Sequence, residues 1–200
     1  KTIAISVYGT TQFTRRGHTF DFADTWKRVD YCEEVERQTG LNPLTASDAA
    51  MRAYLHQEGV SYEGTNTERL IDTLWKHCRK NIAGPVFLIN HPKLISPLAK
   101  ELPDDSERTQ RFQPIIAGTE VGNGYSELNN PVEQRTRFAL QQSMLDRGDE
   151  EAMMTDDEFV EMLDHGMPPT CGFGFGERLF AILEDKPIRE TTLFPLTRQK

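Results

Sequence analysis

The chain has 200 residues, with 23 Lys and Arg against 31 Asp and Glu, and its formal net charge is −8. This length suffices for one sizeable hydrophobic core with a small additional layer. The acidic balance argues against a protein that grips a nucleic-acid backbone on its own, and no apolar run approaches the ~20 residues of a membrane span.

The first two segments differ in their local pattern. Residues 1–22 begin with Thr2–Tyr8, whose alternating apolar residues are typical of an extended strand. Residues 23–84 are predicted to be mostly helical, with helices over Asp48–His56 and Thr67–His77. Their candidate N-caps are Ser47 or Asp48 for the first helix and Asn66 or Thr67 for the second. The second helix carries an apolar stripe that we assign to the core, formed by Leu70, Ile71, Leu74 and Trp75.

Strand patterns follow from residue 85 onward. Val86–Ile89 is a short apolar run typical of a buried strand. Arg111–Gly118 and Thr119–Asn129 are predicted to form an antiparallel pair with a turn near Ala117 and Gly118. Pro114 cannot donate a ladder hydrogen bond, so it places the first of these strands at a sheet edge or at a bulge.

The last third of the chain returns to helices. Pro131 opens a helix, and Thr155 with Glu158 forms a capping box that predicts the start of another. Alternating Gly and Phe in Cys171–Gly176 predict a strand that lets another group approach its backbone, before an amphipathic helix near Glu177. The whole pattern predicts an α+β fold, with an antiparallel sheet backed by helices.

One extended segment concentrates the polar chemistry. Glu120 and Asn123–Asn129 place two carboxylates, a side-chain amide and an aromatic ring in a glycine-containing strand. A carboxylate beside an aromatic face suits an ammonium group. The second carboxylate is free to meet a metal ion or a ribose. From residue types alone, a polar edge strand with solvated charges is an equal alternative.

Arg178 is the second candidate for binding chemistry. It lies in the first turn of the predicted C-terminal helix, where the helix dipole favours anions. We therefore expect Arg178 to face an external anion rather than its own helix. A dinucleotide site is a weak alternative, because Glu177 stands where the third glycine of that fingerprint belongs.

Longer motifs carry a family resemblance. They are Gly9–Thr11, Gly17–Phe22, Pro85–Pro92, Ser96–Lys100, Glu120–Gln134 and Gly166–Gly176. The first two resemble the stretch after motif 2 of class II lysyl-tRNA synthetases, and the next two resemble the two strands before the lysine pocket. The fifth resembles the lysine-pocket strand with the turn after it, and the last resembles motif 3. The run Tyr125–Asn129 distinguishes the lysine enzyme from its aspartate and asparagine relatives.

The resemblance implies a division of the chain. Residues 1–22 would be the joining segment after motif 2, and their first residues would end a helix rather than form a strand. Residues 23–84 would be a helical insertion beside the active site. Residues 85–200 would be the C-terminal part of the catalytic domain. We expect motifs 1 and 2 and the anticodon-binding domain to lie in a longer chain, and these residues alone to activate lysine poorly.

The resemblance also implies an activity, in which lysine and ATP form lysyl-adenylate and the lysyl group passes to tRNA. Glu127 would pair with the lysine ε-ammonium, Tyr125 would lie along its alkyl stem, and Asn123 would orient it. Arg178, as the motif 3 arginine, would be the catalytic residue that contacts the terminal phosphates of ATP. Glu120 would bind ATP and ligate Mg2+.

The strand geometry leads to a structural prediction. The three lysine-pocket side chains share one face of a strand because alternate residues point the same way. Glu120 has the opposite parity, so it can face the same site only if the strand bulges near Gly122 or Gly124.

Two departures from the family pattern bear on the nucleotide side. Gln113 stands where a second magnesium-binding carboxylate is usual, and a neutral amide removes one charge from a site for a hard cation. The run Gly172–Arg178 is one residue shorter than usual, which affects where the helix begins.

The remaining expectations concern partners and location. Cys32, Cys78 and Cys171 are an odd number with no paired spacing, which indicates a reduced compartment, the cytoplasm. The resemblance implies a homodimer, with tRNA held mainly by regions outside this chain. Two alternatives stay open: a lysine-binding paralogue or module without catalysis, and a ligase that attaches lysine to a protein.

Overall fold

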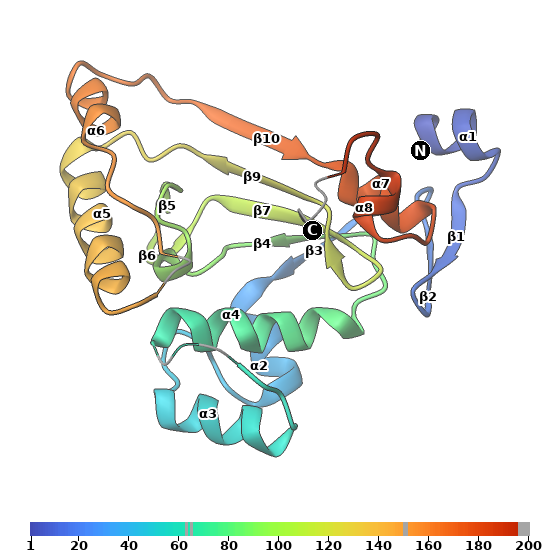
Figure 1. The fold of residues 1–200 in the computed structure, drawn as a ribbon, viewed down its shortest axis with the longest axis horizontal. Helices are drawn as coiled ribbons and strands as arrows, with labels where there is room; N and C mark the ends of the chain where they lie inside the picture. The colour runs from blue at the N-terminus through green and yellow to red at the C-terminus, as the bar shows by residue number, and fades with distance from the viewer. Residues whose placement is uncertain (63, 65, 150–151, 196–200) are drawn as a thin grey trace, which may run out of the picture.

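The computed structural model describes residues 1–62, 64, 66–149 and 152–195. The chain forms a sheet with helices below it and at both ends (Figure 1). The predicted α+β fold is confirmed, and the sheet is mostly antiparallel. No helix in these ranges is long and apolar enough to cross a bilayer.

The elements have the following bounds. The strands are β1 Gln12–Arg15, β2 His18–Asp21, β3 Lys27–Asp30, β4 Val86–Ile89, β5 Glu101–Leu102, β6 Asp105–Thr109, β7 Arg111–Ile116, β8 Thr119–Glu120, β9 Gly122–Ser126 and β10 Cys171–Phe175. The helices are α1 Thr2–Tyr8, α2 Tyr31–Thr39, α3 Asp48–Gln57, α4 Thr67–Cys78, α5 Pro131–Asp146, α6 Asp157–Asp164, α7 Glu177–Leu183 and α8 Ile188–Thr191, with short 3-10 turns at Arg79–Asn81 and Lys93–Ile95.

The central sheet runs in the order β10, β9, β7, β4 and β3, with β8 also paired to β7. All of these pairs are antiparallel except β3 with β4, which is parallel. The residue patterns did not predict β3, because Val29 is the one apolar residue among its four. The segment predicted to be helical therefore begins with a strand of the sheet.

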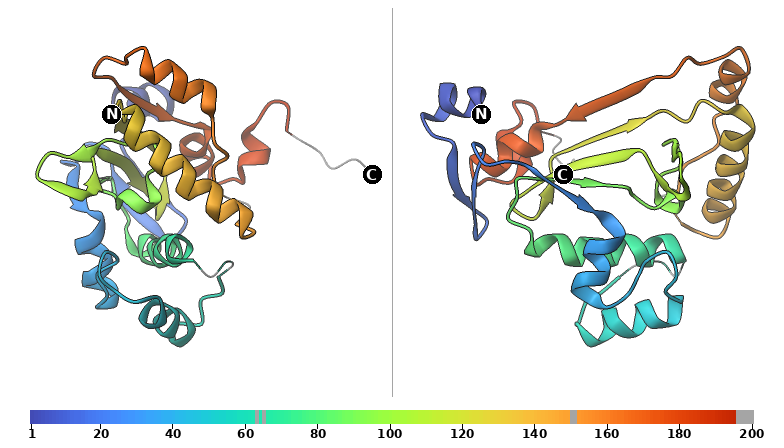
Figure 2. Two further views of the ribbon diagram at one scale, coloured as in Figure 1. Left: turned by 90° about the vertical axis from the view of Figure 1, so that its left-hand side faces the viewer. Right: turned by 180° about the vertical axis from the view of Figure 1, so that it is seen from behind.

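The main core lies between this sheet and α2 to α4, which Figure 2 shows grouped together on one side. The stripe predicted on α4 is confirmed, since Leu70, Ile71, Leu74 and Trp75 are all at most 3 % exposed. The sheet contributes Leu88 and Ile115 to the same core. Side chains of Ser47 and Asn66 cap α3 and α4, as predicted.

Two local predictions were wrong. Thr2–Tyr8 forms a helix, as the family resemblance implied. Gly9 ends this helix in a left-handed conformation (φ 70°), and its N–H donates to the Ile5 carbonyl. The cap of α6 is Asp156 rather than Thr155, and its carboxylate accepts the N–H of Phe159. Both residues can cap a helix, and the acidic one also suits the helix dipole.

A layer of aromatic rings lies on the opposite face of the sheet from α4. Phe112 stacks on Phe173 with ring centroids 5.3 Å apart, and Phe87 meets Phe112 edge-on. The backbone of β9 passes directly over this layer at Gly124. A Cβ on Gly124 would lie 2.6 Å from the Phe112 ring, so the glycine is required by packing rather than by a turn.

We expect Gly124→Ala to destabilise the fold by about 1–3 kcal/mol, because the added methyl overpacks the aromatic layer. Gly174→Ala is the matched control, since a Cβ on this neighbouring strand meets nothing within 4 Å. Urea unfolding of both variants measures the difference. Equal unfolding free energies for the two would contradict the packing argument.

Candidate functional site

The strand that carries the predicted site is bulged. Ile115 and Phe112 are three residues apart on β7, whereas their partners Glu120 and Gly124 are four residues apart. The extra residue lies beside Gly122, where the bulge was predicted, and that prediction is confirmed.

The bulge brings Glu120 onto the same face of the sheet as the predicted lysine-pocket residues. Glu120 pairs with Ile115, and Tyr125 pairs with Arg111. Ile115 and Arg111 are both on the α4 face of β7 because they are four residues apart on a regular strand. Cross-strand partners share a face, so Glu120 and Tyr125 point to the same side of the sheet.

Pro114 explains why the bulge connects to the last strand. β7 is an interior strand, so the edge alternative for Pro114 is wrong and the bulge alternative holds. Val121 donates its N–H to the Pro114 carbonyl at 3.0 Å, but proline has no N–H to return. The Val121 carbonyl instead accepts the N–H of Gly176 at 3.3 Å. This bond fixes the start of α7, and with it Arg178.

The predicted lysine-pocket residues lie together on β9 and just after it. Asn123 accepts a hydrogen bond from Arg111 Nε at 2.9 Å. Arg111 is itself held by the Ile95 carbonyl and the Ser96 hydroxyl, so the amide has a fixed orientation. Tyr125 is half-buried, and burial followed by the Glu127 charge raises the pKa of its hydroxyl.

Glu127 provides the charged side chain of this group that is best suited to bind a ligand. Its backbone N–H donates to Thr170, but its carboxylate makes no hydrogen bond or ion pair within the part of the chain that the structure describes. The side chain is half-buried, and this desolvation raises its pKa. A partly desolvated carboxylate without a partner favours a cationic ligand.

Glu120 is surrounded by donors from two directions. Trp75 Nε1 donates to one carboxylate oxygen at 2.7 Å, and Arg79 forms an ion pair with the other. Arg178 is exposed, and its Nη1 donates to the Glu120 backbone carbonyl at 3.3 Å. Glu120 and Arg178, which were predicted for the nucleotide side, are therefore neighbours. Trp75 and Arg79 were not predicted to belong to the site.

The residues around Glu120 do not fit a magnesium ion as they stand. Both carboxylate oxygens already accept from donors, one of them cationic. The buried nitrogen left without a partner here is Arg79 Nε, a donor that needs an acceptor and not a metal. Across the described ranges, no group of three or more His, Cys, Asp and Glu is arranged to hold a metal ion.

Gln113 is held on the buried side of the sheet by His91. Nε2 of His91 lies 2.9 Å from the Gln113 amide oxygen, and Nδ1 lies 3.2 Å from the Arg111 carbonyl. His91 is 1 % exposed. Burial, and then the charge of Arg111, lowers the pKa of His91 from 6.5 to about 3. A ring with a pKa this low is neutral at pH 7.

His91 should make the protein less stable in acid. Between pH 6.5 and pH 3 the unfolded chain protonates this residue and the folded chain does not, so unfolding is favoured as the pH falls. From pH 7 to pH 5 the loss from this one residue is about 2 kcal/mol. Urea unfolding at the two pH values should show a shallower dependence for His91→Gln. The exposed His165→Gln should behave like the wild type, and a similar change in both variants would contradict the assignment.

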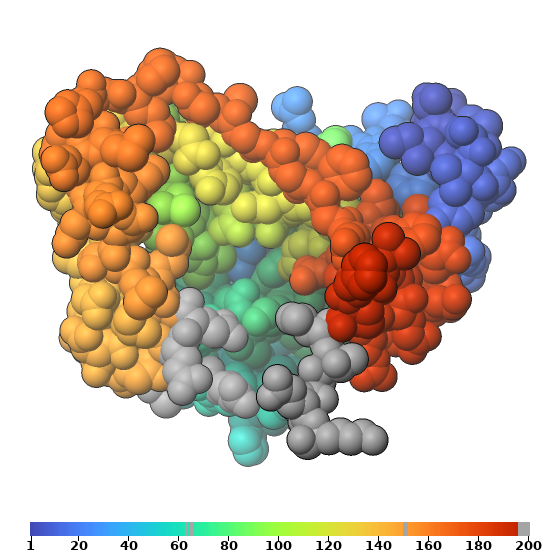
Figure 3. Space-filling model, turned by 45° about the horizontal axis from the view of Figure 1, so that its top comes forward, coloured from blue at the N-terminus to red at the C-terminus, as the bar shows by residue number. Residues whose placement is uncertain are grey.

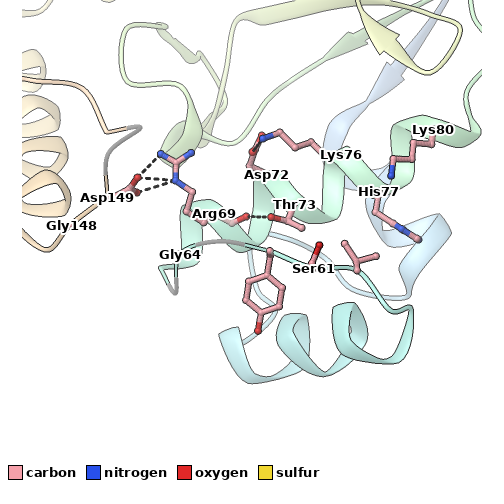
Figure 4. Close-up of a pocket in the computed structure, with 12 residues that line it drawn as sticks. Ser61, Gly64, Arg69, Asp72, Thr73, Lys76, His77, Lys80, Gly148 and Asp149 are labelled. Atoms are coloured by element: carbon pink, nitrogen blue, oxygen red, sulfur yellow. Dashed lines mark hydrogen bonds and ion pairs between the residues drawn. The ribbon is translucent and has the colours of Figure 1, made fainter. Parts of the chain in front are cut away.

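The surface is hollowed between α5 and α6 on one side and α7 and α8 on the other, with α4 at the bottom (Figure 3). A cavity of about 710 Å³ lies along α4 beside Gly148 and Asp149 (Figure 4). Its described lining contains none of the predicted site residues. Arg69 and Lys76 in this lining are paired with Asp149 and Asp72, so much of its charge is already neutralised.

The mixed sheet, the Glu127 carboxylate after β9, which has no partner among the described residues, and the arginine after the Gly/Phe strand agree with a domain of the class II aminoacyl-tRNA synthetase type. A family model described as tRNA synthetases class II (D, K and N) matches residues 2–198. The chain therefore belongs to this family.

Several curated relatives are named lysine–tRNA ligase. The proteins from Fervidobacterium nodosum and Thermotoga maritima are each 41 % identical over 194 residues, which is 96 % of this chain and 38 % and 39 % of theirs. The protein from Porphyromonas gingivalis is 39 % identical over 197 residues, 96 % of this chain and 34 % of its own. The chain thus spans roughly two fifths or less of these relatives.

Proposed function

We propose that the protein activates lysine with ATP and transfers the lysyl group to tRNA. The observation that carries this proposal is the Glu127 carboxylate, which is half-buried, has no partner among the described residues, and lies near Tyr125. The name lysine–tRNA ligase on similar proteins supports it.

In this proposal the lysine side chain binds along β9. Its ε-ammonium pairs with Glu127, where a charge-assisted hydrogen bond offsets the loss of solvation. Its alkyl stem lies along the Tyr125 ring. Asn123 orients the amino acid, and the bond from Arg111 Nε supports this because it fixes the amide.

The ATP side of the proposal centres on Arg178 and Glu120. Arg178 is exposed, and among the described residues its guanidinium makes one hydrogen bond, to the Glu120 carbonyl at 3.3 Å, so its other nitrogens are available to the terminal phosphates. A planar guanidinium binds phosphate oxygens in pairs. The chain would then act by positioning both substrates and by neutralising charge that develops on the phosphates.

The wider assignments belong to the same proposal. We assign residues 1–22 to a joining segment, 23–84 to a helical insertion and 85–200 to the catalytic part. tRNA accepts the lysyl group, the intact protein is a homodimer, and it works in the cytoplasm. The free thiols of the buried Cys32 and Cys78 and the exposed Cys171 suit a reducing compartment.

A lysine-binding module that does not activate its ligand is the second candidate. The specific observation in its favour is the ion pair of Arg79 with Glu120, which occupies the carboxylate assigned to the nucleotide side.

Lysine-dependent exchange of pyrophosphate into ATP on the intact protein separates the two candidates. Exchange with lysine, and not with ornithine or arginine, is the expected result, and charging of tRNA then completes the assignment. Lysine binding without exchange would overturn the proposed activity and favour the binding module.

A further inference from the structure

The charge of Glu120 is balanced by an arginine from the α4 side of the molecule. Arg79 follows α4 directly, and its guanidinium pairs with Glu120 while the Trp75 indole donates to the other oxygen. The Glu120 and Arg79 side chains are only 15 % and 21 % exposed. Solvent and salt screen such an enclosed pair weakly, so the guanidinium neutralises the carboxylate locally.

The backbone holds the two partners in register. The turn that precedes Glu120 and the segment that follows Arg79 are joined by two hydrogen bonds, from Ala117 N–H to Ala83 at 2.7 Å and from Gly118 N–H to Ile82 at 2.8 Å. The ion pair therefore lies at a junction between the helical segment and the sheet that backbone hydrogen bonds hold together.

A metal ion on Glu120 would have to displace this guanidinium. Magnesium and manganese prefer carboxylate oxygens. Gln113, which stands where a second magnesium-binding carboxylate is usual, is neutral and lies against His91. Arg79 already supplies a positive charge at the point where a metal would supply it.

We propose that Arg79 takes the place of a divalent cation on Glu120, so that a metal ion entering with ATP binds the phosphates and not this carboxylate. This inference rests on the proposed function, because it assumes that the protein binds ATP. Arg79 is then a positioning residue that holds Glu120. Its positive charge is part of the chain and, unlike a metal ion, cannot leave the site.

Titration with Mn2+, followed by the paramagnetic resonance signal of the free ion, tests this on the intact protein without ATP. Arg79→Met should create a site that binds Mn2+ at least tenfold more tightly than the wild type. Adding Glu120→Gln to that variant should remove the site. Arg79→Lys keeps a cation and should resemble the wild type, as should Lys80→Met, which removes a neighbouring charge without touching Glu120.

Two results would overturn the proposal: no gain of Mn2+ affinity in a folded Arg79→Met variant, or a wild-type site that Glu120→Gln weakens tenfold. If Arg79→Met does not fold, Glu120→Gln alone decides, and unchanged Mn2+ binding supports the proposal. The outcome is separate from the proposed function, because a protein without lysine-dependent exchange would still report its Mn2+ sites.

Discussion

Glu127→Gln is expected to reduce lysine-dependent pyrophosphate exchange about a hundredfold or more, mainly through weaker lysine binding. The amide keeps the size of the side chain and one acceptor oxygen but removes the charge that the ε-ammonium needs. Loss of one partner from a partly desolvated ion pair costs about 3–5 kcal/mol, which corresponds to a factor of a hundred or more. Isothermal titration with lysine and exchange rates at several lysine concentrations measure it.

The control for this variant is Glu107→Gln, the same chemical change on an exposed side chain. It should leave lysine binding unchanged. A second readout comes from pH: because burial raises the pKa of Glu127, lysine affinity in the wild type should fall as the pH drops toward that raised value. Wild-type affinity in Glu127→Gln would remove Glu127 from the pocket.

Arg178→Lys is the second variant with a large expected effect. Lysine keeps the positive charge but loses the planar fork that binds two phosphate oxygens at once. We expect exchange to fall about a hundredfold, since removal of one electrostatic contact to a developing charge costs about 10²–10³ in rate. Lysine affinity should not change, because Arg178 contacts Glu120 and not the residues assigned to lysine.

Arg189→Lys provides the comparison, because Arg189 is an exposed arginine on the nearby helix α8. It should exchange pyrophosphate at the wild-type rate. Steady-state measurements at varied ATP locate the defect of Arg178→Lys, and an unchanged rate at all ATP concentrations would contradict its assignment to the phosphates.

Local patterns predicted much of this fold because they report physical requirements of single elements. The α4 stripe and the caps at Ser47 and Asn66 are set within a few residues, and the structure has them as predicted. The bulge was predictable for a different reason. Side chains alternate strictly between the two faces of a strand, so Glu120 could share a face with Asn123 and Tyr125 only through an extra residue.

The rest depends on contacts between distant parts of the chain. Lys27–Asp30 forms a strand because β4 offers an edge, and its own residues carry little strand signal. Arg79 meets Glu120 across 41 residues of sequence. The available signal was that Trp75 and Arg79 are four residues apart at the end of one helix and so lie on one side. That spacing shows that Trp75 and Arg79 are neighbours, but it does not show that both contact Glu120.

Pro114 has a consequence for anyone who scans this protein by mutation. The link from Val121 to Gly176 uses main-chain atoms alone, so ordinary side-chain changes at either position leave it in place. We expect any other residue at Pro114 to supply a backbone N–H that competes for the Val121 carbonyl. We therefore expect a change at Pro114 to disturb the start of α7, and with it the position of Arg178, although Pro114 itself lies on another strand.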